Sequence, residues 1–171
     1  GLSTKYRYEE KARREIAEPN DGARGSGNVL ANSVVALAAV LLAAASPSHT
    51  GVGAEPFLYA FAGAVAAALS DTFSSEFGGL FDRPRLITTL EPVDPGTDGA
   101  VTWQGEVAGL VGAGLVAGIA ALLFGEVAPA GAGVVLAAGV AGMTVDSLLG
   151  ATVEGRLVGN QGVNLLATLS A

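Results

Sequence analysis

The stretch that decides the fold is Phe57-Leu-Tyr-Ala-Phe-Ala-Gly-Ala-Val-Ala-Ala-Ala-Leu-Ser70, which continues directly into Asp71-Thr-Phe-Ser-Ser-Glu-Phe-Gly-Gly79. Its first half carries no charge, whereas its second half carries the acids Asp71 and Glu76. A spanning helix needs roughly 20 predominantly apolar residues, and this stretch has that length and character. Carboxylates in such a helix are costly and usually mark a functional site. The stretch therefore predicts a membrane helix with a polar site at one end.

A second apolar segment repeats this arrangement farther along the chain. It runs from Gly131 to Val145 and continues into Asp146-Ser-Leu-Leu-Gly150. Two acids at matching depth on two helices could hold one metal ion between them, and oxygen ligands of this kind suit Mg²⁺. We therefore expect Asp71 and Asp146 to approach a common centre.

Composition and charge placement extend the membrane prediction to the whole chain. Half of the 171 residues are apolar, mainly Ala, Val, Leu and Gly, and small residues suit close packing of membrane helices. The absence of Cys excludes disulfides and thiolate metal sites. We predict an all-α, polytopic transmembrane bundle with about five spans, forming a single domain over residues 1–171 that lacks one or more N-terminal helices and the end of the last helix. The expected spans are Val29–Ser46, Phe57–Gly79, Gln104–Phe124, Gly131–Val153 and a fifth that begins near Gly162.

The basic residues test this span assignment independently. All nine fall in the first segment or in alternate loops, which places them on one side of the membrane if the spans are right. The positive-inside rule makes that side cytoplasmic. These residues are Lys5, Arg7, Lys11, Arg13, Arg14, Arg24, Arg83, Arg85 and Arg156.

The net charge of −7 gives no sign of nucleic-acid binding, because the basic cluster at residues 5–14 is interleaved with acids and lacks repeated aromatic platforms. The partner implied by the composition is the lipid bilayer. The sequence does not indicate an oligomeric state.

Polar residues gather at the predicted cytoplasmic ends of the spans and in the long loop between Leu80 and Trp103. Loops of this length inside compact bundles are usually functional. Carboxylates bind hard cations, arginines bind phosphate oxygens in pairs, and glycine amides can bind the remaining phosphate oxygens. The mixture therefore suits a magnesium nucleotide. Besides Asp71, Glu76 and Asp146, the candidates are Asn28, Asn32, Arg83, Arg85, Thr88, Thr89, Gly96, Thr97, Asp98, Gly99, Asn160 and Asn164. Within the loop, Leu86–Thr89 favours extended structure and Pro95–Gly99 favours a tight turn.

At these residues the chain resembles a known family. The matching blocks are Ser70–Gly78, Arg83–Thr89, Pro95–Gly99, Asp146–Thr152 and Asn160–Thr168, preceded by Lys5–Lys11 and Gly25–Asn32. Together they are similar to the integral-membrane family that includes the chloroplast phytyl-phosphate kinase, which is distantly related to dolichol kinases and CDP-diacylglycerol-type cytidylyltransferases.

The resemblance implies a phosphotransferase that uses CTP or another nucleoside triphosphate as donor. It also implies an isoprenoid monophosphate, such as phytyl or geranylgeranyl phosphate, as acceptor and the diphosphate as product. In that reading Asp71, Glu76 and Asp146 bind Mg²⁺, while Arg83 and Arg85 neutralise phosphate. A cytidylyltransferase acting on a lipid phosphate would have nearly the same site. A transporter with an intramembrane acidic pathway is the alternative of another class.

Overall fold

The computed structural model describes residues 7–13, 26–49, 53–123, 129–155 and 157–171. Within these ranges, four helices are long and apolar enough to cross a membrane. They match the first four predicted spans to within a few residues, and the all-α bundle is confirmed. The helices are α2 (Tyr8–Arg13), α4 (Ser26–His49), α5 (Glu55–Gly78), α6 (Trp103–Leu123), α7 (Pro129–Thr152) and α8 (Asn160–Leu169).

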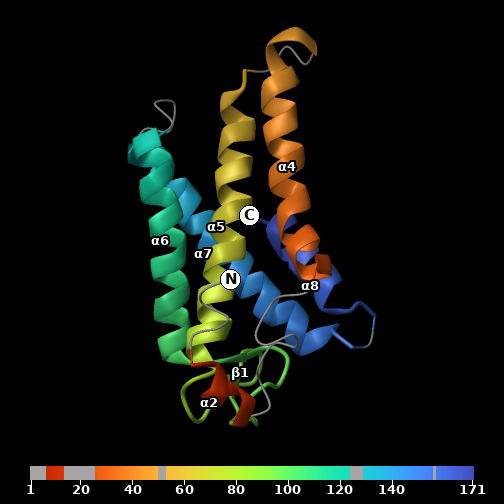
Figure 1. Cartoon of the computed structure of the whole chain (residues 1–171), viewed down its shortest axis with the longest axis vertical. Coiled ribbons are helices and arrows are strands. Elements are labelled where there is room, and N and C mark those ends of the chain that lie inside the picture. Colours follow the sequence, from red (N-terminus) through yellow and green to blue (C-terminus); the bar gives the residue numbers. More distant parts are fainter. Residues whose placement is uncertain (1–6, 14–25, 50–52, 124–128, 156) are drawn as a thin grey trace.

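Helix α5 lies at the centre of the bundle and packs against α4, α6 and α7. Figure 1 shows α4, α5 and α6 running roughly alongside one another, while α7 crosses them obliquely. The short helix α8 packs against α4 and α7. It begins where the fifth span was expected, and it covers ten residues.

The interior of the bundle is made of small residues, and the large aliphatic residues face outward. A water-soluble protein would bury its leucines, whereas lipid is as apolar as leucine and leaves close packing to Ala and Gly. The distribution therefore identifies the outer surface as the surface that meets lipid. Buried positions include Ala62, Ala64, Ala66, Ala113 and Ala117, and exposed ones include Leu30, Leu37, Leu41, Leu110, Leu115 and Leu122.

The loop between α5 and α6 folds back on itself at one end of the bundle, next to α2 (Figure 1). Strand β1 (Arg85–Leu86) pairs antiparallel with β2 (Ala100–Val101), with Arg85 opposite Val101. The extended structure predicted over Leu86–Thr89 is limited to Leu86, because residues 87–89 form a turn closed by the hydrogen bond from Leu90 N to Leu86 O.

Candidate functional site

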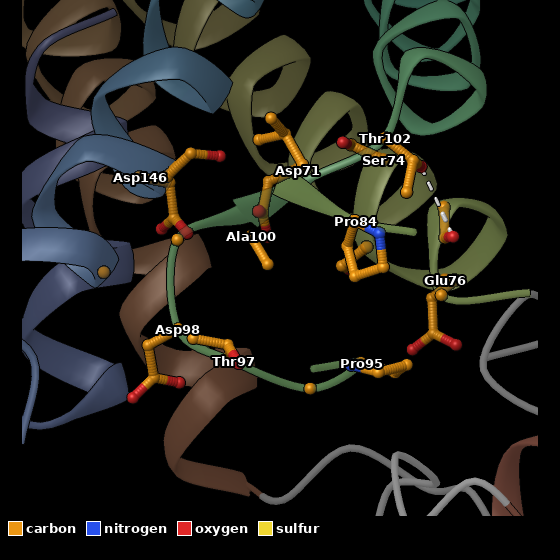
Figure 2. A pocket seen from close by; sticks show the side chains of 18 of the residues that line it. Asp71, Ser74, Glu76, Pro84, Pro95, Thr97, Asp98, Ala100, Thr102 and Asp146 are labelled. Carbon is orange, nitrogen blue, oxygen red and sulfur yellow. Dashed lines mark hydrogen bonds between the residues drawn. The ribbon is translucent and has the colours of Figure 1, made fainter. Parts of the chain in front are cut away.

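A cavity of about 430 Å³ lies where the ends of α5 and α7 meet this loop. Figure 2 shows Asp71 and Asp146, which come from α5 and α7, on the opposite wall from the turn that carries Thr97 and Asp98. Its volume falls within the range of small-molecule sites, roughly 300–1,000 Å³. Among the described residues, five acids and one basic residue line it: Asp71, Glu76, Asp98, Asp146, Glu154 and Lys11.

The predicted tight turn forms one rim of the cavity and sits directly on α7. Thr97 N donates a hydrogen bond of 3.2 Å to Asp94 O, and Gly96 and Gly99 both have positive φ angles. A Cβ on Gly99 would lie 2.4 Å from Ala151 N and 2.6 Å from Ser147 O. Only glycine therefore allows the turn to approach α7 this closely, and that approach brings Asp98 to the cavity.

Asp71 and Asp146 both line this cavity, and both are partly buried. That they share one metal ion stays a prediction. The Oδ1 atom of Asp146 is fully buried. The hydroxyl residues Ser74 and Ser147 also line the cavity. Among the described residues there is no group of three or more His, Asp or Glu side chains placed to hold a metal ion. Two carboxylates with nearby oxygens still fit Mg²⁺, which typically takes one or two carboxylates together with substrate phosphates.

The prediction for Glu76 requires a correction, because this carboxylate forms an ion pair with a lysine. Its Oε2 atom accepts a hydrogen bond from Lys11 Nζ, and the two side chains form an ion pair that is almost wholly buried. The prediction that Glu76 is a third metal ligand is therefore not supported by this arrangement. Lys11 comes from α2, a helix that the sequence analysis did not connect with the site.

Glu154 is a further cavity residue that the sequence analysis missed. It lies just beyond α7 and lines the cavity. Asp146, Gly150 and Glu154 are four positions apart, which is the spacing of one helix face, and this signal in the sequence could have identified Glu154. Burial raises the pKa of Glu154 above its ordinary value of 4.5, and the charge of Asp98 raises it further. A hydrogen bond with the Asn160 side chain acts in the opposite direction, and the Asp71 charge adds a smaller upward effect. The cavity is thus an environment that favours a bound cation.

The two arginines of the loop lie outside the cavity, as do Thr88 and Thr89. Arg83 and Arg85 are both exposed, and an Arg85 guanidinium nitrogen donates to the carbonyl of Leu90. Pro84, between them, is the residue that enters the lining. The expectation that a guanidinium points into the mouth is therefore corrected: Arg85 lies exposed on β1, and Arg83, which precedes β1 with a positive φ of 63°, is exposed as well.

The asparagine pairs lie together where α4 and α8 begin. Asn160 lines the acidic cavity and also a neighbouring polar cavity of about 560 Å³, which Asn28 lines from α4. Asn164 Nδ2 donates a 3.2 Å hydrogen bond to Asn160 Oδ1. Asn32 is partly buried and lines neither of these two cavities. Asn28 and Asn160 are therefore neighbours of the acidic site, whereas Asn164 supports Asn160.

Fold and cavity together define a polytopic helical membrane protein with an acidic pocket at one end of the bundle. The chain belongs to the integral membrane protein family DUF92, whose model matches residues 1–171. This membership confirms the resemblance drawn from the sequence motifs. No solved structure matches the chain.

Several curated proteins are similar to the chain. An uncharacterized membrane protein of Methanocaldococcus jannaschii is 40% identical over 92% of this chain and 63% of its own length. Protein PGR of Arabidopsis thaliana is 34% identical over 88% of this chain and 59% of its own length. The chloroplastic protein VTE6 of the same plant is 29% identical over 89% of this chain and 45% of its own length. The chain thus spans less than two thirds of the length of these relatives.

Proposed function

We propose that the acidic cavity is the site of a membrane phosphotransferase. It would transfer a phosphate from a nucleoside triphosphate, with CTP as the first candidate, to an isoprenoid monophosphate. The observation that carries the proposal is the convergence of Asp71 and Asp146, from two membrane-spanning helices, on one cavity rimmed by the turn at Gly96–Gly99. Similarity to the family that includes the chloroplast phytyl-phosphate kinase supports the choice of acceptor.

Asp71 and Asp146 would hold Mg²⁺ in this proposal, and Ser74 and Ser147 line the same cavity. The ion would neutralise charge on the transferring phosphate, which is the main requirement of phosphoryl transfer. The acceptor phosphate is already anionic, so its oxygen can form the new P–O bond without a general base. The donor's terminal P–O bond breaks, and the nucleoside diphosphate leaves.

The position of the cavity fits a lipid substrate. Its acids lie at the end of the bundle on which the basic residues are predicted to gather, so we place its opening on the cytoplasmic side. Between α5, α6 and α7, the interior away from the cavity is filled by Ala62, Ala66, Val116 and Ala117. This packing favours a site open to one side over the transport pathway of the alternative reading.

The test is to incubate purified protein in detergent with labelled CTP or ATP, Mg²⁺ and a panel of prenyl monophosphates, and to identify the lipid product. A lipid diphosphate is expected, whereas a CMP-containing lipid would establish the cytidylyltransferase instead. Asp71→Asn and Asp146→Asn should each reduce turnover about a hundredfold or more, because each removes charge that the transition state requires. Glu55→Gln is the matched control, since Glu55 is an exposed acid at the other end of α5. Equal turnover in wild type and both Asn variants would refute the proposal.

A further inference from the structure

The acidic cavity contains a buried lysine that the proposed reaction does not yet use. Lys11 is 2% exposed and is the only Lys or Arg among the described residues that line the cavity. It belongs to α2. Its ion-pair partner, Glu76 on α5, lies 65 positions farther along the chain. A buried charge pair costs desolvation and is weak evidence for stability alone. Its placement in a cavity wall therefore calls for a role beyond holding α2.

We propose that Lys11 is the phosphate-binding cation of this cavity and that Glu76 positions it. This inference rests on the proposed function, because it names the group that meets a phosphate in the same site. An ammonium carries three N–H donors, so Lys11 can donate to Glu76 and to a phosphate oxygen together.

The charges of the cavity explain why such a cation is needed. Asp71, Asp98, Asp146 and Glu154 all repel a phosphate that enters without compensation. Arg83 and Arg85, which would otherwise compensate, are exposed outside the lining. Glu76 holds the Lys11 side chain in one direction, so less of its rotamer entropy is lost when a phosphate binds. The carboxylate thus acts as a positioning residue for the lysine.

Two phosphate sources are compatible with this chemistry, and calorimetry on the full chain can separate them. Magnesium tripolyphosphate mimics the donor's phosphate chain, and dodecyl phosphate below its critical micelle concentration mimics the lipid acceptor. Lys11→Met should weaken at least one of them about tenfold or more, because it removes a charge-assisted hydrogen bond. The weakened probe identifies which substrate Lys11 meets. Arg7→Met is the matched control, since Arg7 immediately precedes α2 and pairs with Glu10, but is exposed.

Further variants separate phosphate binding from a purely structural ion pair. Glu76→Gln keeps an amide oxygen that can still accept a hydrogen bond from Lys11 and position it, while one negative charge is removed, so this variant should bind the same probe at least as tightly as wild type. Lys11→Met alone leaves Glu76 buried and unneutralised, which can prevent folding. The double variant Lys11→Met/Glu76→Leu avoids this problem, since apolar replacement of a buried pair is often neutral for stability. The double variant should melt near the wild-type temperature, and it should still bind the affected phosphate probe about tenfold more weakly than wild type does.

The inference is overturned if the double variant binds both probes as wild type does, if Glu76→Gln loses as much affinity as Lys11→Met, or if wild type binds neither probe. Failure of the proposed function looks different. In that case no prenyl monophosphate is phosphorylated by wild type, although phosphate binding still depends on Lys11.

Discussion

Gly78 on α5 and Gly105 on α6 face each other so closely that a Cβ on either would lie 3.1 Å from the Cα of the other. Near this contact, Thr102 Oγ1 donates to Gly78 O at 3.3 Å, and Gly105 N donates to Thr102 Oγ1 at 3.2 Å. Gly78 and Thr102 also line the acidic cavity. The close approach of two helix backbones therefore forms part of the cavity wall.

The first prediction concerns this contact. In Gly105→Ala, the new Cβ would lie 2.8 Å from Ser74 O, so the helices must separate. We expect a loss of about 1–3 kcal/mol, the usual cost of overpacking. Gly118→Ala on the same helix is the control, because its Cβ meets nothing within 4 Å and alanine favours helix. The apparent melting temperature in detergent should fall for Gly105→Ala and stay level or rise for Gly118→Ala. Equal shifts in the two variants would contradict the packing.

The second prediction concerns the turn that rims the cavity. Gly99 and Gly155 both have positive φ angles, 73° and 70°. Alanine at either position costs about 1–2 kcal/mol of left-handed strain. Only at Gly99 does the new Cβ also collide with Ser147 and Ala151, whereas at Gly155 it meets nothing within 4 Å.

Gly99→Ala should therefore push the turn off α7 and greatly reduce turnover, while Gly155→Ala should lose stability with little effect on turnover. Kinetics and melting curves of the two variants side by side make the comparison. If the two variants lose turnover equally, packing of the turn against α7 is not needed for activity.

The sequence predicts the spanning helices well because lipid imposes a simple rule on them. The charge-free runs around Ala64 and Ala113 are long enough to cross the bilayer as helices, and a helix satisfies the backbone groups within its own segment. Asp71 and Asp146 could be paired for the same reason, because each lies at the end of such a run.

The remaining site residues depend on contacts that are distant in the sequence. Nothing in residues 8–13 shows that Lys11 reaches Glu76, since the segment is a short run with two acidic and two basic residues. The position of Arg85 depends on pairing between β1 and β2 across a loop of more than ten residues. Strands of two residues give no detectable alternation in the sequence, so this pairing could not be predicted.

The third prediction concerns pH. The pKa of Glu154 is raised in the folded protein, first by burial and then by the charge of Asp98. Below its ordinary pKa of 4.5, Glu154 is neutral in both folded and unfolded chains and carries no penalty. As the pH rises above 4.5 the unfolded chain ionises first, so the folded state loses stability until the pH passes the raised folded pKa.

Glu154→Gln cannot ionise and should therefore melt at a higher temperature than wild type at pH 7.5 without metal. The difference should shrink toward zero as the pH falls below 4.5. Added Mg²⁺ should stabilise wild type more than Glu154→Gln, because a cation compensates the crowded carboxylates. Melting curves between pH 4 and 8, with Glu55→Gln as control, measure both effects. If wild type is more stable than Glu154→Gln at pH 7.5 in the presence of a chelator, the ionised Glu154 carboxylate does not destabilise the folded protein, and this prediction is wrong.

The last prediction concerns orientation in the membrane. Gly53, between α4 and α5, and Asp94, in the loop between α5 and α6, lie at opposite ends of α5, and both are exposed. The chain has no cysteine, so Gly53→Cys and Asp94→Cys each introduce a single reactive thiol. Because the basic residues are predicted to lie on the Asp94 side, the positive-inside rule makes that side cytoplasmic. In intact cells, a membrane-impermeant maleimide should label Gly53→Cys and should reach Asp94→Cys only after the membrane is permeabilised.

The reverse labelling pattern would place the acidic cavity outside the cytoplasm, where nucleoside triphosphates are scarce, and would count against a nucleotide donor. Labelling of both variants from outside would show that α5 does not cross the bilayer.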